Sequence, residues 1–424
     1  MNRIIPLIST ALIFFLLGYY SYSNKTFPYS YVREAYGQLK VIKEMLGLSK
    51  PHHLYRAVYE SYGANVVNAS EIMPGSTLVT SYWRDLGWKA GIKLINRDGK
   101  ILHTWNADPT KIWKSNLQAR MLNFVHGTYL FPNGDILFNI EFMGLVRMDS
   151  CGNIKWVLDY STHHSISRND KGDFWVSGNT LQNDPSYIEN YTGLESPIYE
   201  DHALLVSPEG QILKDINILK VIYDNELQRY LPKISNRKHG DIFHLNDIEE
   251  LSVKVANQYP HFQAGDLLIS LKFMHLVLVM NPETKKVKWY TSDPIIEQHD
   301  PDFIGDGWIG IFDNNSDYAR GKMLGGSRIL AINPQSMETK VLYKGSADRS
   351  FYTETGGKWQ ILENSNMLIV EARAGRVFEV DRYGNIVWEW IHDRYNKSLI
   401  PEVLEATRYP YTEQQINKWS CSQN

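Results

Sequence analysis

Short apolar runs alternate with turn residues along most of the chain after residue 76. One pattern recurs six times: a strand, a turn containing Asp, Asn or Pro, and a second strand that often ends in Trp. The copies read INRDGKILHTW (95–105), MDSCGNIKWVL (148–158), VSPEGQILKDI (206–216), MNPETKKVKWY (280–290), INPQSMETKVLYK (332–344) and VDRYGNIVWEW (380–390). Such turns between apolar segments predict six β-hairpins.

A further strand pattern precedes most of these hairpins. It reads LFPNGDILFNI (130–140), AGDLLISL (264–271), IGDGWIGIFDN (304–314) and LENSNMLIVEA (362–372). Each unit therefore holds about four strands, and six such units predict an all-β, six-bladed β-propeller over residues 71–395. A β-sandwich with long insertions is the alternative, and six similar hairpins favour the propeller. The C-terminal extension, residues 396–424, either closes the ring or packs below it.

The N-terminal pattern is different. Residues 4–20 are almost wholly apolar and uncharged, a length between that of a signal-peptide core and that of a minimal membrane span. We therefore expect residues 1–24 to form a transmembrane anchor or a signal sequence. Either would place the propeller outside the cytoplasm, on the periplasmic or extracytoplasmic side of the membrane.

The segment between this stretch and the propeller has a helical pattern. Apolar residues recur at spacings of three and four, at Val32, Tyr36, Leu39, Ile42 and Leu46. This period predicts a helical linker within residues 25–70.

Composition and motif content exclude several classes of function. Lys and Arg total 44 against 47 Asp and Glu, a net charge of −3, which argues against a nucleic-acid-binding protein. The two cysteines, Cys151 and Cys421, are too few for a cysteine zinc site, and a disulfide between them would need an oxidising compartment. The sequence contains neither a phosphate-binding glycine loop nor a nucleophile elbow.

Histidines recur at the start of the units. They are His126, the pair His163 and His164, His244, and His299. Because the first strand of each propeller blade lines the central channel, histidines from four blades are expected to meet at one mouth of it. Asn246 and Lys272 fall beside the same opening. Together these side chains predict a cationic, donor-rich pocket that holds an anion, with a neutral imidazole available as nucleophile.

Two segments carry a family resemblance: HLNDIEEL followed by GDLLISLK, and QHDPDFIGDGWIGIFDNN (298–315). From about residue 75 to 392 the chain resembles the arylsulfate sulfotransferases, exported six-bladed propellers that act on phenolic sulfate esters. The resemblance implies transfer of a sulfuryl group from an aryl sulfate to a phenol through a sulfohistidine, without nucleotide donor, cofactor or metal.

The resemblance also implies residue roles. His299 matches the nucleophile, and His244 with Asn246 matches the pair that binds sulfuryl oxygens or protonates the leaving phenolate. His164 matches the channel-facing histidine. His163 and His126 are expected to bind substrate.

One position departs from the family pattern, because Lys272 stands where the family carries an arginine. Lysine keeps the charge but loses the planar fork that grips two oxygens. A membrane-tethered binding propeller without activity, or an iron or zinc enzyme built on four histidines, therefore remain as alternatives. Candidates to replace the arginine are Arg320, Arg328 and Arg373, and candidates to orient the His299 imidazole are Asp300, Asp313 and Asn314.

Overall fold

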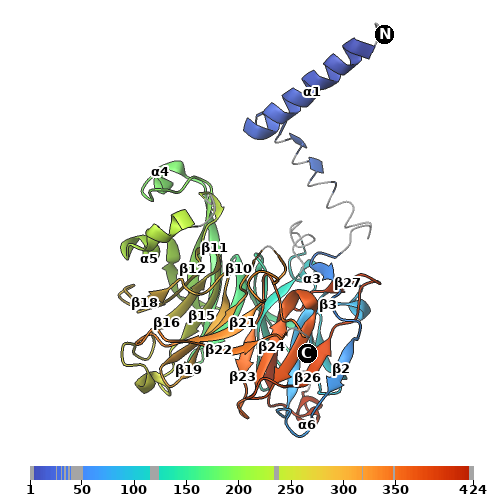
Figure 1. Cartoon of the computed structure of the whole chain (residues 1–424), viewed down its shortest axis with the longest axis vertical. Helices are drawn as coiled ribbons and strands as arrows, with labels where there is room; N and C mark the ends of the chain where they lie inside the picture. Colours follow the sequence, from blue (N-terminus) through green and yellow to red (C-terminus); the bar gives the residue numbers. More distant parts are fainter. Residues whose placement is uncertain are drawn as a thin grey trace.

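The structure is a computed structural model. It describes residues 4–24, 26–29, 31–32, 35–36, 39, 51–114, 124–233, 238–317, 319–346 and 349–419. In this part of the chain, six sheets form a six-bladed β-propeller, as predicted (Figure 1). Each sheet contains four antiparallel strands, and two of the sheets carry a fifth strand.

Each blade runs outward from its first strand. Blade 1 is β28 (Glu405–Tyr409), β3 (Ser76–Trp83), β4 (Lys89–Ile95) and β5 (Ile101–Trp105). Blade 2 is β6 (Val125–Leu130), β7 (Ile136–Ile140), β8 (Gly144–Met148) and β9 (Ile154–Leu158). Blade 3 is β10 (Thr162–Arg168), β11 (Phe174–Gln182), β12 (Ile198–Val206) and β13 (Ile212–Asn217), with β14 (Gly240–Asp241) parallel to β12.

The other three blades have the same order. Blade 4 is β15 (Leu245–Glu250), β16 (Leu267–Leu271), β17 (Leu276–Met280) and β18 (Val287–Thr291). Blade 5 is β19 (His299–Gly305), β20 (Trp308–Asp313), β21 (Arg328–Ile332) and β22 (Thr339–Lys344). Blade 6 is β23 (Trp359–Ile361), β24 (Met367–Glu371), β25 (Arg376–Val380) and β26 (Ile386–Ile391), with β2 (Gly63–Val66) on its outer edge.

The first strands of neighbouring blades form the inner ring. β6 contacts β10, β10 contacts β15, β15 contacts β19, and β28 contacts both β6 and β23. The six hairpins predicted from the sequence join the third and fourth strands of the six blades. Each pair carries one register shift, which lies next to the turn in five blades and between Ile329 and Leu330 in blade 5. Buried tryptophans pack between the sheets, among them Trp105, Trp175, Trp359 and Trp388.

Both ends of the propeller segment take part in closing the ring. β28, within the predicted C-terminal extension, pairs with β3 and forms the inner strand of blade 1. β2 pairs with β26 on the outside of blade 6, where the two lie side by side in Figure 1. A short ladder of β1 (Leu54–Arg56) with β27 (Leu399–Pro401) adds a third link between the two ends.

The helical linker predicted within residues 25–70 is only partly correct. The described residues between 29 and 39 are helical, whereas β1 and β2 are strands. Long-range pairing with β27 and β26 overrides the local helical period there. Ile42 and Leu46 lie outside the described residues.

Beyond the helical residues between 29 and 39, the helices of the described residues are short apart from the first one. They are α1 (Ile4–Asn24), α3 (Pro109–Ile112), α4 (Pro185–Ile188), α5 (Ile218–Asp224) and α6 (Glu413–Ile416), with 3-10 turns η1 (Arg84–Leu86), η3 (Leu227–Lys233), η4 (Ala256–Gln258), η5 (Lys272–Met274) and η6 (Ala372–Ala374). The transmembrane anchor predicted within residues 1–24 finds no support: among the described residues, no helix is sufficiently long and apolar to cross a membrane. Cys151 is disulfide-bonded, and Cys421 lies outside the described residues.

Candidate functional site

The inner strands of four blades are irregular at the same level of the channel. The ladder register shifts between Val125 and Thr128 in β6, and between His163 and Ile166 in β10. It also shifts in β15 after Leu245 and in β19 after His299. A bulge inserts residues that have no ladder partner and re-aims their side chains, and bulges of this kind are common beside active sites.

The backbone is held in an unusual conformation within or directly before these bulges. His164 has φ 55°, His244 has φ 57° and Asp300 has φ 45°. Non-glycine residues rarely adopt these angles, and such strain gathers at functional sites. The bulges of three adjacent blades therefore hold polar side chains in fixed positions around the channel.

The predicted site residues lie together, although not at one repeat position. His163 and His299 pair with the second strands of their blades, His126 and His164 lie inside bulges, and His244 precedes β15. The rings of His126 and His164 are 4.2 Å apart between centroids, and those of His164 and His244 are 4.7 Å apart. A narrow cavity of the channel is bordered by His126, Asn246 and His299.

The hydrogen bonds around His299 fix its tautomer. Its Nδ1 lies 2.6 Å from Asn314 Oδ1 and 3.0 Å from the carbonyl oxygen of Glu297. Asn314 donates from Nδ2 to the carbonyls of Thr353, at 2.9 Å, and Gly356, at 2.7 Å, so its oxygen is the atom that faces the ring. With two acceptors beside it, Nδ1 carries the proton, and Nε2 carries the lone pair.

The electrostatic surroundings keep this imidazole neutral. His299 is 4% exposed, and burial lowers its pKa well below the usual value, with further lowering by the charge of Lys272. The hydrogen bond to Asn314 opposes this shift. A neutral imidazole with its Nε2 lone pair free of a proton is the nucleophilic form.

Of the three candidates to orient His299, Asn314 is the one that contacts it. Asp313 instead forms an ion pair with Arg328, at 2.8 Å. Asp300 accepts the backbone N–H of Trp359, at 2.8 Å, and lies 3.2 Å from Lys358 Nζ.

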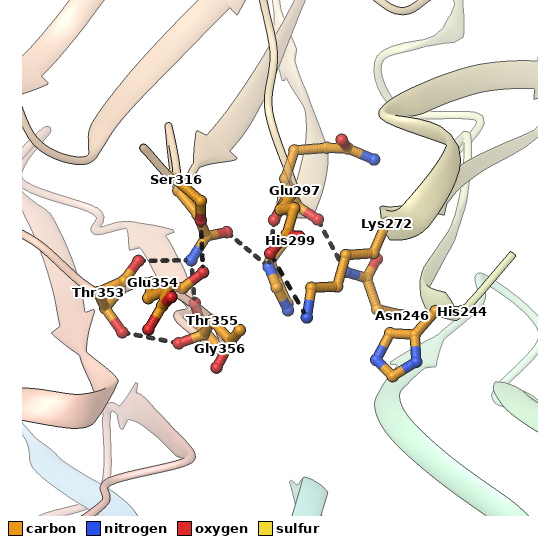
Figure 2. A network of polar contacts seen from close by, with 12 residues as sticks. His244, Asn246, Lys272, Glu297, His299, Ser316, Thr353, Glu354, Thr355 and Gly356 are labelled. Carbon is orange, nitrogen blue, oxygen red and sulfur yellow. Dashed lines mark hydrogen bonds and ion pairs between the residues drawn. The ribbon is translucent and has the colours of Figure 1, made fainter. Parts of the chain in front are cut away.

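Lys272 supplies positive charge beside His299. Lys272 is 6% exposed, and its Nζ lies 3.9 Å from Glu297 Oε2. In Figure 2 the ends of the Lys272, His244 and His299 side chains are directed toward a common space. Of the candidates to replace the family arginine, Arg328 and Arg373 are ion-paired with Asp313 and Glu354, and Arg320 is exposed. Lys272 is therefore the cation placed to meet an anion held at His299.

His244 and Asn246 are each held by one hydrogen bond. Asp241 Oδ2 lies 2.5 Å from His244 Nδ1, which leaves Nε2 of that ring available. Asn246 donates from Nδ2 to the carbonyl of Gln298, at 2.8 Å, and its buried Oδ1 has no hydrogen-bond partner. The second Nδ2 hydrogen of Asn246 remains for a ligand.

The second histidine group lies on the blade 3 side. Nδ1 of His163 and Nδ1 of His164 are 2.9 Å apart, and burial lowers the pKa of His163 to about 4 and that of His164 well below its usual value. Glu141, which follows β7, contacts this group: its Oε2 lies 3.1 Å from His126 Nδ1, and its Oε1 lies 3.8 Å from His164 Nδ1.

Three site carboxylates were missed from the sequence: Glu141, Asp241 and Glu297. They occupy loops or strand ends that carry no motif of their own, so only the pairing of strands brings them to the histidines. Only Glu297 could have been suspected from the sequence, because it lies two residues before His299.

The cavity bordered by His126 and His299 is also bordered by carboxyl groups and Lys358. Lys358 is surrounded by Asp247, Asp300, Asp302 and Glu405, and their charges raise its pKa well above its usual value against the opposing effect of burial. Burial and neighbouring carboxylates raise the pKa of Asp247 to about 7. Imidazoles and carboxyl groups therefore border the same cavity of the channel.

Fold and site together define a class: a propeller whose channel presents a neutral, oriented histidine beside a lysine. The chain belongs to the arylsulfotransferase family, because the family model described as arylsulfotransferase (ASST) matches residues 128–394. The match includes every predicted site residue except His126, which lies two residues before it. A search of curated proteins gave no match.

A search of solved structures gave matches at low identity and low structural similarity. A protein of unknown function from Bacteroides caccae is 14% identical, with a TM-score of 0.47, over 78% of this chain and 99% of its own. A virginiamycin B lyase from Staphylococcus aureus is 12% identical, with a TM-score of 0.40, over 78% and 89%. The Pan2 WD40 domain of Neurospora crassa is 10% identical, with a TM-score of 0.40, over 77% and 85%.

Proposed function

We propose that the protein transfers a sulfuryl group from a phenolic sulfate ester to a phenol, through a sulfohistidine at Nε2 of His299. The observation that carries this proposal is the hydrogen bond from His299 Nδ1 to Asn314 Oδ1, at 2.6 Å. It holds the proton on Nδ1, leaves the lone pair on Nε2 and so keeps the ring in the nucleophilic tautomer. Family membership supplies the substrate class.

The first half-reaction forms one bond and breaks one. The Nε2 lone pair of His299 attacks the sulfur of the donor, and the bond from sulfur to the aryl oxygen breaks. The electron pair leaves with the phenolate, which takes a proton. His244 is the proposed proton donor, because Asp241 holds its Nδ1 and its ring stands on the channel side. The sulfuryl group now sits on Nε2, while Nδ1 keeps its proton and its acceptor Asn314.

The second half-reaction reverses these events. The oxygen of an acceptor phenol attacks sulfur, the bond from sulfur to Nε2 breaks, and the electron pair returns to His299. The acceptor loses its proton to the group that protonated the donor phenolate. No oxidant, metal or nucleotide is needed for the balance. Lys272 and the free Nδ2 hydrogen of Asn246 stabilise the charge on the sulfuryl oxygens during both steps.

The test is a chromogenic aryl sulfate mixed with the protein, with and without an added phenol. Phenolate release that requires the acceptor, and that is lost in His299→Ala, is the expected result. With donor alone, intact-mass analysis should show one sulfuryl group on the wild type and none on His299→Ala. His202→Gln is the matched control, since this histidine also pairs with a carboxylate, Asp215, at 2.6 Å but lies on the outer part of blade 3. Release that persists in His299→Ala would remove His299 as nucleophile.

A protein that releases no phenolate with any acceptor, yet binds aryl sulfates at this site, would be a binding propeller. In that case the replacement of the family arginine by Lys272 is the change to reverse first. Lys272→Arg should then restore transfer, measured by the same release assay.

A further inference from the structure

A second set of ligating groups lies beside the residues proposed for transfer. His126 in β6, Glu141 after β7 and His164 in β10 each present one nitrogen or oxygen ligand atom, and these three atoms all lie within 4.8 Å of one another. We propose that these three side chains bind one divalent transition-metal ion with the coordination preferences of zinc. The proposal goes beyond sulfuryl transfer and does not depend on it.

The donor set fits this class of ion. Two imidazole nitrogens and one carboxylate oxygen form a common protein site for zinc and other first-row divalent metals, with a further position left for water or a ligand. At bond lengths of about 2.1 Å, neighbouring ligand atoms of a tetrahedral site lie about 3.4 Å apart. Glu141 Oε2 lies 3.1 Å from His126 Nδ1 and Glu141 Oε1 lies 3.8 Å from His164 Nδ1, so one carboxylate oxygen faces each imidazole at a separation near this value. Ligation through a single oxygen requires a rotation of the carboxylate.

The three side chains are held by rigid elements. Gly127, next to His126, has φ 84°, and a Cβ there would lie 1.8 Å from the carbonyl oxygen of His164. The same carbonyl accepts a hydrogen bond from Asn139 Nδ2, at 2.9 Å. The backbones of blades 2 and 3 therefore approach closely at this level, and this approach fixes the separation of the two imidazoles.

The surroundings also suit a bound cation. Glu141 and His164 are 5% and 4% exposed, and the partner of this buried carboxylate in the absence of metal is His126, at 3.1 Å. A bound ion would take over that role, because a ligating imidazole is neutral. His126 is the partly exposed member, and it borders the channel cavity. Water or an anion can therefore reach a fourth coordination position from the channel.

His163 competes with the ion for one ligand atom. His163 Nδ1 lies 2.9 Å from His164 Nδ1, so a metal bound through that nitrogen must replace this hydrogen bond. We therefore expect metal affinity to rise when His163 is replaced by Leu in a variant that folds.

The experiment titrates the full chain with Co²⁺, whose visible absorption reports its coordination, followed by competition with Zn²⁺ and metal analysis after dialysis. We expect one ion per chain, bands of a four- or five-coordinate site with nitrogen ligands, and loss of the bands on adding Zn²⁺. Glu141→Gln and His126→Gln should each weaken binding at least about tenfold. His202→Gln is the control that keeps binding unchanged.

Two measurements distinguish a lost metal ligand from a folding defect. Far-ultraviolet circular dichroism and thermal unfolding without metal show whether each variant is folded, and His126, the partly exposed ligand, is the one whose change disturbs packing least. Absence of the Co²⁺ bands, or unchanged binding in a folded His126→Gln protein, overturns the proposal. Because metal binding is measured directly, neither result bears on transfer through His299.

Discussion

Asn314 is the residue that gives His299 its chemical character. Its amide is locked by the Thr353 and Gly356 carbonyls, and its oxygen then defines which nitrogen of His299 is protonated. An asparagine holds no charge, so it orients the ring without raising the imidazole's basicity as strongly as a carboxylate would. The site therefore favours a good leaving group at Nε2 as well as a good nucleophile.

Replacing Asn314 by Ala should lower kcat by about 10²-fold, because the ring loses its orientation. KM for the aryl sulfate should change little, since Asn314 faces the far side of the imidazole. Steady-state kinetics with saturating acceptor measure both values. If KM rises instead and kcat stays unchanged, Asn314 acts in substrate binding.

Lys272 should act on the pH profile as well as on the rate. Burial and Lys272 both hold the pKa of His299 well below 6.5, so the neutral nucleophile persists on acidification and transfer should continue as the pH falls through that value. Lys272→Met removes the second cause, which raises the pKa of His299 and moves the acid limb of kcat/KM to higher pH. The rate should also drop by about 10²-fold with the lost oxyanion contact.

The profiles are measured from the same aryl sulfate assay over a pH series. Lys288→Met is the control, because Lys288 is also ion-paired, with Asp266 at 2.6 Å, but on the outer strand β18. An acid limb that stays in place in Lys272→Met would show that burial alone sets the His299 pKa.

At the scale of the element, the bulged inner strand is the feature that builds the site. A regular strand directs successive side chains to opposite faces, so it could not present both His163 and His164 toward their partners. The bulge of β10 allows this, and the close approach of β6 at Gly127 holds it in place.

Gly127→Ala should therefore destabilise the protein by about 3 kcal/mol, through a left-handed backbone angle combined with a collision against the His164 carbonyl. Gly152→Ala is the matched control, with φ 82° and no atom within 4 Å of the added Cβ, and it should cost only about 1 to 2 kcal/mol. Denaturant unfolding of both variants measures the difference. Equal losses would show that the two blades separate easily at Gly127.

The same elements explain what the sequence could and could not predict. The six hairpins were predicted correctly because turn and strand signals are local. The histidines were predicted to meet because each stands at the start of a unit whose strand and turn pattern is recognisable in the sequence. Glu141 was missed because it meets His126 only through the pairing of β6 with β7, and the strands β1 and β2 were missed because their partners lie more than 300 residues away.

At the scale of the whole molecule, the channel combines two kinds of side chains. Imidazoles lie around His299, and carboxyl groups, among them Asp247, Glu249, Asp302 and Glu405, lie around Lys358. Burial raises the pKa of all four carboxyl groups, to about 7 for Asp247 and about 8 for Glu249. Protonation of these carboxyl groups therefore stabilises the folded propeller.

The raised pKa values of these carboxyl groups determine how the stability of the protein changes with pH. The folded protein keeps protons on these carboxyl groups that the unfolded chain has released, so the free energy of unfolding should fall as the pH rises from about 5 through 8. Glu249→Gln should flatten this decline, because its amide needs no proton. Thermal unfolding over a pH series measures the effect, with the exposed Asp98→Asn as control. A stability that rises over this range would mean that the carboxylates are ionised throughout.

The closure of the ring by β28 bears on how the protein is made. Blade 1 lacks its inner strand until Glu405–Tyr409 has left the ribosome, although His299 and Asn314 have emerged long before. A nascent chain can thus form the hairpins of blades 2 to 5 in turn, but the channel around His299 is closed only after β28 has emerged. If His299 is the nucleophile as proposed, chains that stop before β28 should be inactive, and activity should begin only after this strand has been made.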